Sequence, residues 1–148
     1  MGASRSLGLF TTLLLGECLL TGKLVRAADI QQTVYMLPDE AAECRYIDSL
    51  VKEAESAVDS AKKLQREGES LSGRAAIPKL LAAAEFSLKF ANNKALDIYS
   101  AGKAVEIKRG TVPACVTVAR NKAGDMMQET LLIANQCTTR VNQITGMR

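Results

Sequence analysis

The fold of this chain is decided by residues 77–105, which read IPKLLAAAEFSLKFANNKALDIYSAGKAV. Apolar or small residues recur there with spacings that alternate between four and three: Ile77, Leu81, Ala84, Leu88, Ala91, Ala95, Ile98, Gly102 and Val105. Such spacing places these residues on one stripe of an α-helix, whereas the faces of a strand alternate every second residue. We therefore predict a helix over about 76–109, with Pro78 in its first turn and Gly110 as its stop.

Two similar stripes flank this helix. The earlier one predicts a helix over about 39–67 that starts at Pro38 and Asp39 and stops at Gly68; its residues are Cys44, Ile47, Val51, Ala54, Val58 and Ala61. The later one predicts a helix over about 112–144, capped by Thr111 and with Pro113 in its first turn. The residues of this stripe are Val112, Val116, Ala119, Ala123, Met127, Thr130, Ala134, Cys137, Val141 and Ile144.

Three such helices, each roughly 45 Å long, bury their stripes only by packing against one another. Their short connections make neighbours antiparallel, so we predict an all-α fold: an elongated antiparallel three-helix bundle (up-down-up) with coiled-coil-like seams, over residues 38–148. Residues 28–37 are expected to be an extended N-terminal segment. Within it, Tyr35, Met36 and Leu37 either fold back on the bundle or form an exposed docking strip.

The N-terminus has the order of a secretory signal, which we predict over residues 1–27 with the cut before Ala28. Its apolar run, Leu7 to Leu20, is interrupted by Glu17 and is shorter than the roughly 20 residues that span a bilayer. The C-terminus lacks the hydrophobic tail of a lipid-anchor signal. We expect a secreted, extracellular chain that has no transmembrane segment when mature and that is either free or held at a cell surface by a partner.

The cysteines test the predicted topology. Because the second helix returns the chain to its starting point, Cys44 and Cys115 lie at the same end of the bundle, and we predict a disulfide between them. Cys137 follows Cys115 by 22 residues, which corresponds to about 33 Å along a helix and is beyond disulfide reach. Cys137 is therefore either a free, buried thiol or the partner of a cysteine in another chain, while Cys18 leaves with the signal.

The composition argues against an enzyme and against a nucleic-acid partner. The chain has no His and no Trp, which excludes imidazole-based catalysis and metal ligation. The formal net charge is +3, and it is +1 from Ala28 onward because three bases and one acid precede that residue. The glycines of Gly68–Gly73 are spaced as in a phosphate loop, but Arg74-Ala75 replaces the required Lys-Ser/Thr. We predict no catalytic, metal-binding or cofactor-binding residues and no cofactor.

Four residues inside the predicted helices are poor helix formers: Asn92, Asn93, Gly102 and Gly124. They indicate either close packing between helices or, alternatively, a bend or a ligand contact.

An exported chain in which Cys44 and Cys115 open long helices around a helical hairpin resembles the helical-bundle surface proteins of African trypanosomes. That group includes the variant and invariant surface glycoproteins, the haptoglobin–haemoglobin and transferrin receptors, and expression-site- or procyclin-associated gene products. The resemblance covers about residues 28–148 and implies a non-enzymatic role as a coat component or a receptor for a host macromolecule. We expect this chain to depart from the pattern by lacking a C-terminal domain and an anchor signal, and residues 1–148 contain no glycosylation sequon.

Two functions follow from these observations. The first is a structural or recognition module that binds a protein partner or a second copy of itself. The second is a secreted carrier of a small apolar ligand, such as a lipid. The small side chains of the seams leave little interior volume, which favours the module.

Overall fold

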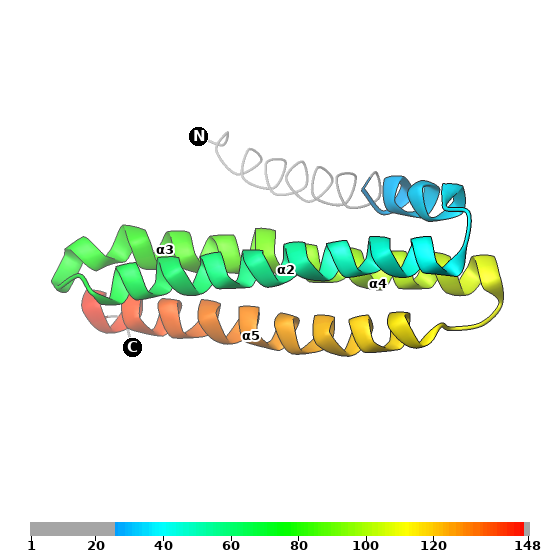
Figure 1. The fold of residues 1–148 in the computed structure, drawn as a ribbon. Coiled ribbons are helices and arrows are strands. Elements are labelled where there is room, and N and C mark those ends of the chain that lie inside the picture. The colour runs from blue at the N-terminus through cyan, green and yellow to red at the C-terminus, as the bar shows by residue number, and fades with distance from the viewer. Residues whose placement is uncertain (1–25, 147–148) are drawn as a thin grey trace, which may run out of the picture.

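The computed structural model describes residues 26–146, and all regular structure in this part of the chain is helical. The prediction of an all-α fold is confirmed. Figure 1 shows an elongated molecule whose long helices lie side by side. Its first and last long helices are α2 (Glu40–Glu69) and α5 (Ala114–Thr145). No helix within residues 26–146 combines the length and the apolar character needed to cross a membrane.

The second predicted helix is divided, so the expected count of three helices is not confirmed. After α2 the chain forms a short 3₁₀ turn, η1 (Gly73–Ala76), and then α3 (Ile77–Phe86), a π turn, η2 (Ser87–Ala91), and α4 (Asn92–Arg109). From residue 40 onward the α-helices are α2 to α5, and α3, η2 and α4 follow one another along α2 (Figure 1).

The π turn explains where the predicted stripe is wrong. A π turn holds one more residue than an α turn. Up to its first residue, Ser87, buried positions are displaced by one from the predicted 3–4 repeat, although Ala84 is buried as predicted. Leu80 is fully buried in place of Leu81, and Ser87 in place of Leu88. Leu81 and Leu88 are instead 49% and 43% exposed. From the last residue of the π turn onward the prediction holds, because Ala91, Ala95, Ile98, Gly102 and Val105 are all buried.

The segment before α2 is a helix over residues 26–36, which we call the N-terminal helix; the prediction of an extended segment over 28–37 was wrong. Ile30 and Val34, one turn apart, are buried in the core formed by α2, α4 and α5. Lys108 donates from Nζ to the carbonyl oxygens of Val34 (3.2 Å) and Leu37 (2.5 Å), which satisfies groups that a helix end leaves free. Tyr35 and Met36 remain exposed. The predicted signal lies outside the described residues except for Arg26 and Ala27.

Two predicted helix boundaries were also wrong. Helix α2 continues through Gly68, which is buried; a Cβ on this glycine would lie 2.8 Å from Cδ2 of Leu80, so the glycine permits close packing of α3. Helix α5 begins at Ala114 with extended Pro113 as its cap, and Thr111 does not cap it. A residue that precedes proline is driven out of the helical region, and this excludes Val112 from the helix.

Other predicted boundaries are confirmed. Asp39 caps α2, since its side chain accepts a hydrogen bond of 2.7 Å from the Ala42 N–H. Pro78 lies in the first turn of α3. Gly110 ends α4 with a positive φ of 73°, the left-handed conformation that glycine adopts readily.

Candidate functional site: an aromatic groove beside the π turn

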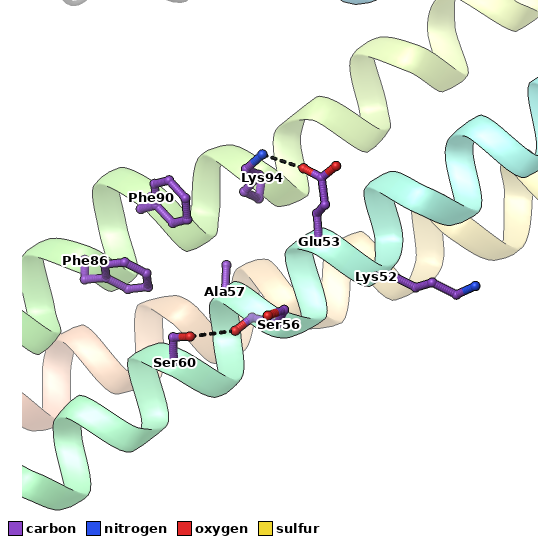
Figure 2. Close-up of a pocket in the computed structure, with 8 residues that line it drawn as sticks. All are labelled: Lys52, Glu53, Ser56, Ala57, Ser60, Phe86, Phe90 and Lys94. Carbon is purple, nitrogen blue, oxygen red and sulfur yellow. Dashed lines mark hydrogen bonds and ion pairs between the residues drawn. The ribbon is translucent and has the colours of Figure 1, made fainter.

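The candidate site is a groove of about 450 Å³ between α2 and the α3–η2–α4 segment. Figure 2 shows Phe86 and Phe90 on one wall and the small residues of α2 on the other. The lining is mostly apolar and comes from eight residues: Lys52, Glu53, Ser56, Ala57, Ser60, Phe86, Phe90 and Lys94. Its volume falls in the range of about 300–1,000 Å³ typical of ligand sites, but the groove is open to solvent rather than enclosed.

The two phenylalanines form the centre of the groove. Their ring centroids are 4.9 Å apart with the planes inclined at 34°, a tilted arrangement within the range favoured by aromatic pairs. Phe86 ends α3 and is half-buried, whereas Phe90 lies in η2 and is 45% exposed. An aromatic ring exposed to this extent next to a second ring offers apolar area to a bound partner.

Charged residues close one end of the groove. Lys94 Nζ lies 2.6 Å from Glu53 Oε2 and joins α4 to α2. The same ammonium is 5.8 Å from the centroid of the Phe90 ring, within the range of a cation–π contact. On the opposite wall the Ser60 hydroxyl donates to the Ser56 carbonyl oxygen at 2.9 Å, so it is satisfied within its own helix. In Figure 2 the Lys52 side chain points away from the rings along α2.

Polar contacts with α5 support the π turn that positions Phe90. The buried Ser87 hydroxyl donates to the Thr130 carbonyl oxygen at 2.7 Å. Thr130 Oγ1 donates to the Met127 carbonyl oxygen at 2.8 Å and lies 3.4 Å from Asn92 Oδ1. Each contact pairs a group that burial would otherwise leave unsatisfied. Because π turns are frequent at functional sites, this turn marks the groove beside it as a candidate site.

Of the four poor helix formers, the two asparagines follow the π turn and the two glycines lie at close helix contacts. Asn92 and Asn93 directly follow the π turn, and Asn93 Nδ2 donates to the Lys89 carbonyl oxygen at 2.5 Å. The glycines indicate close packing, since a Cβ on Gly102 would lie 2.9 Å from Val116 Cγ1, and one on Gly124 would lie 3.2 Å from the Tyr99 hydroxyl.

Next along the α2–α4 interface is a buried acid, Asp97, which is 7% exposed. Its Oδ2 lies 2.7 Å from Arg26 Nη2 of the N-terminal helix. The contact lacks hydrogen-bond geometry, so Oδ2 has no hydrogen-bond partner among the described residues. Burial raises the pKa of Asp97 above its ordinary value of 3.8, although the charges of Arg26 and Lys94 oppose that rise.

The predicted cysteine arrangement is present in the structure. Cys44 and Cys115 form a disulfide, with their Cα atoms 5.8 Å apart, at the end of the bundle where α4 turns into α5. Among the cysteines described, Cys137 is free, and it is 1% exposed within the core of the opposite end. Burial, followed by the charge of Glu69, raises the pKa of its thiol above 9.0.

Beside the disulfide lies an ion cluster that the sequence did not reveal. Glu43, 1% exposed, pairs with Lys108 at 2.8 Å and also accepts a hydrogen bond from Arg109 Nε. Burial acts to raise the pKa of Glu43, but the hydrogen bonds and charges of Arg109 and Lys108 outweigh it and hold the pKa below 4.5. This cluster fastens α2 to the end of α4.

The sequence reasoning missed the aromatic groove and the buried Asp97. The available signal was the concentration of aromatic residues, because two of the three phenylalanines of the chain lie four residues apart at 86 and 90. No group of three or more metal-ligating side chains gathers within the described part of the chain.

Comparison with protein-family models, curated proteins and solved structures found no match to this chain. The resemblance to trypanosome surface proteins therefore stays a prediction.

Proposed function

We propose that this chain is a non-enzymatic, exported recognition module that binds a protein partner through the aromatic groove. The observation that carries the proposal is the half-exposed Phe90 packed at a tilt against Phe86 in an open groove. Aromatic residues in apolar pockets are the usual centres of protein–protein interfaces. The disulfide supports an oxidising compartment, because such bonds persist outside the cytosol.

We also propose that the module works as three rods in up-down-up order, with α3, η2 and α4 acting as one continuous rod. Backbone hydrogen bonds run through the junctions: Ser87 N–H donates to the carbonyl oxygens of Ala83 and Ala84, and Asn92 N–H donates to that of Ser87. A stiff rod holds Phe86 and Phe90 in a fixed relation to α2, which reduces the entropy lost on binding.

The proposed role agrees with the one implied by the trypanosome surface proteins, either secreted or held at a cell surface by the partner. The test is to tag the full chain in the cells that make it, label them without permeabilisation, and cross-link surface and medium proteins. We expect the chain outside the cells, with one stoichiometric cross-linked partner that Phe90→Ser abolishes.

Leu132→Ser is the matched control, because Leu132 is 55% exposed but does not line the groove. Its cross-links should equal those of the wild type. A cytosolic chain would contradict export, and equal cross-linking by the Phe90→Ser variant would contradict recognition through the groove.

The carrier function remains the second candidate, favoured by the volume and apolar lining of the groove. Native mass spectrometry of the chain purified from its own cells distinguishes the two. A bound lipid lost in the Phe90→Ser variant supports the carrier, whereas a ligand-free chain together with a stoichiometric protein partner supports the module.

A further inference from the structure

Asp97 of α4 is a buried acid that can accept more hydrogen bonds than it receives. It is 7% exposed, and its Oδ2 lies 2.7 Å from Arg26 Nη2 of the N-terminal helix. Even so, this oxygen has no hydrogen-bond partner among the described residues. A buried acceptor without a donor is costly, and in a folded protein it calls for an explanation.

The predicted cut before Ala28 removes Arg26 but keeps the part of the N-terminal helix that is anchored in the core. Ile30 is buried in the same cluster as Ile98, the neighbour of Asp97 in α4. The processed helix therefore keeps its seat beside Asp97 while the guanidinium leaves. Removing one member of a buried ion pair is strongly destabilising unless another cation takes its place.

The same cut creates a cation in the same helical turn. The new α-ammonium belongs to Ala28, two residues after Arg26, which is about 3 Å along the helix axis. Only two residues connect it to the anchor Ile30, and they reach at most about 7 Å when extended. An α-ammonium offers three N–H donors, as a lysine ammonium does, and the first N–H groups of a helix that begins at Ala28 have no partner within the helix. Because Arg26 contacts Asp97, these donors lie at the helix end next to that acid.

Resting on the export proposed above and on the cut before Ala28, we infer that the α-ammonium of Ala28 replaces Arg26 at Asp97 in the processed chain and fastens the N-terminal helix to α4. The carboxylate of Asp97 then serves as the counter-ion of the ammonium. It also places negative charge beside the N-terminus of the shortened helix, where the helix dipole favours it. The docked position of the N-terminal helix therefore depends on where the leader is cut.

The charges around Asp97 leave this role to the new N-terminus. In α4, Lys94 is the other cation that acts on Asp97, but its Nζ already lies 2.6 Å from Glu53 Oε2 of α2. Also in α2, Tyr46 stays neutral at pH 8, because burial raises its pKa above 10.0. Once Arg26 has gone, the described charges that act on Asp97 are those of Lys94 and Glu53, which oppose each other. A further cation is then needed to balance Asp97 itself.

The test measures how protonated the Ala28 amine is in the full chain secreted from insect cells, after the N-terminus of the released protein has been sequenced. Trace acetic anhydride acetylates this amine only when it is neutral, and mass spectrometry of the N-terminal peptide gives the rate from pH 6 to pH 10. The reference is a synthetic peptide of residues 28–36. We expect the chain to begin at Ala28 and, at pH 7, to be acetylated about tenfold more slowly than the peptide, since a nearby carboxylate raises the pKa of the amine. The two rates should converge toward pH 10, which simple burial of the amine would not produce.

Three variants show whether Asp97 is responsible. Asp97→Asn should be acetylated within about twofold of the peptide at every pH, because the coupled pair has lost one member. Asp29→Asn is the matched control: Asp29 is exposed and adjoins Ala28, so its removal should change the rate by about twofold at most. If Asp97→Asn fails to fold, insertion of Gly-Ser-Gly-Ser before Ala28, which moves the ammonium away from Asp97, should also restore the rate of the peptide.

The outcomes separate this inference from the proposed function. A secreted chain that begins at Ala28 but is acetylated as fast as the peptide, or equally slowly with Asp97→Asn, overturns the ion pair and leaves export and the aromatic groove intact. A released chain that still carries Arg26 also overturns it, because Asp97 keeps its first partner. A chain that never reaches the medium contradicts both proposals.

Discussion

The two ends of the bundle are stabilised in different ways. The end at which α4 turns into α5 has the Cys44–Cys115 disulfide, the buried Glu43 cluster and a core of eighteen buried residues that includes the N-terminal helix. The opposite end, where α2 turns into α3, has nine buried core residues and depends on the close approach of Gly68 and Leu80. Because buried apolar area is the main source of stability, the second end should open first, and the aromatic groove lies between the two.

Removing the disulfide should give the largest change in the free energy of unfolding. The bond joins cysteines 71 residues apart, and loss of a cross-link that closes such a loop lowers the free energy of unfolding by about 4 kcal/mol in the chain-entropy model. The Cys44→Ser/Cys115→Ser variant should show this loss in guanidinium denaturation. A loss under about 1 kcal/mol would mean that the ion cluster and the core hold this end unaided.

Glu43→Gln should rank second, with a loss of about 2 kcal/mol at neutral pH, because it removes the charged contacts of a buried carboxylate with Lys108 and Arg109, although Arg109 keeps Glu40. The pH dependence follows from the lowered pKa of Glu43. An acid with a lowered folded pKa stabilises the protein fully above its unfolded pKa, here about 4.5, and this contribution is lost as the pH falls through the folded value.

Denaturation between pH 7 and pH 2 should therefore show a shallower acid decline in Glu43→Gln than in the wild type. Parallel declines would show that Glu43 does not hold the disulfide end through its charge. Asp97 should act in the opposite direction, since burial raises its pKa. Its carboxylate lowers stability as the pH rises from about 3.8 through its higher folded pKa, and Asp97→Asn removes that decline.

Gly68→Ala tests the weaker end. The added Cβ would lie 2.8 Å from Leu80 Cδ2 and 3.1 Å from the Leu80 backbone nitrogen, and such overpacking costs about 1–3 kcal/mol. Hydrogen exchange should accelerate in α3 and in the end of α2 while the amides around the disulfide stay protected.

Gly124→Ala is its control in α5. The new Cβ would meet only the Tyr99 hydroxyl, at 3.2 Å, and alanine adds up to about 1 kcal/mol of helix propensity, so the change should be near neutral or stabilising. Equal destabilisation by both substitutions would contradict the proposal that this end of the bundle depends on the Gly68–Leu80 contact.

Cys137 gives the smallest expected effect. Cys137→Ser should lower the free energy of unfolding by about 1 kcal/mol, because a hydroxyl replaces a small apolar group in the core of the weaker end. Iodoacetamide should modify the wild-type thiol only in denaturant, since burial protects it and raises its pKa. A disulfide-linked dimer on a non-reducing gel would instead show that Cys137 joins two chains.

The long elements and the disulfide could be predicted from the sequence because each depends on local rules. Spacings of three and four residues specify a helix regardless of its surroundings, and Asp39 and Gly110 mark boundaries through their own conformational preferences. Once the order of the helices was assumed, chain geometry brought Cys44 near Cys115 and kept Cys137 away. The errors at Gly68 and Thr111 arose where packing against Leu80 and the restriction before Pro113 overrode those preferences.

The candidate site could not be predicted in the same way. The π turn displaces the buried stripe by one residue, and this displacement does not show in the sequence. Either Leu80 or Leu81, and either Ser87 or Leu88, could have been the buried residue of a helix. The burial of Asp97 and Glu43 also depends on neighbours far along the chain, Arg26 for one and Lys108 and Arg109 for the other.

The sequence by itself determined that this chain is helical, because backbone periodicity acts over short, countable distances; the cysteine pair followed only once the order of the helices was assumed. Only the tertiary structure decided that the N-terminal segment is a helix, where the π turn lies and that two phenylalanines line an open groove. These features depend on which surfaces meet and on how much water their packing excludes, and that is a property of the assembled helices rather than of any one segment.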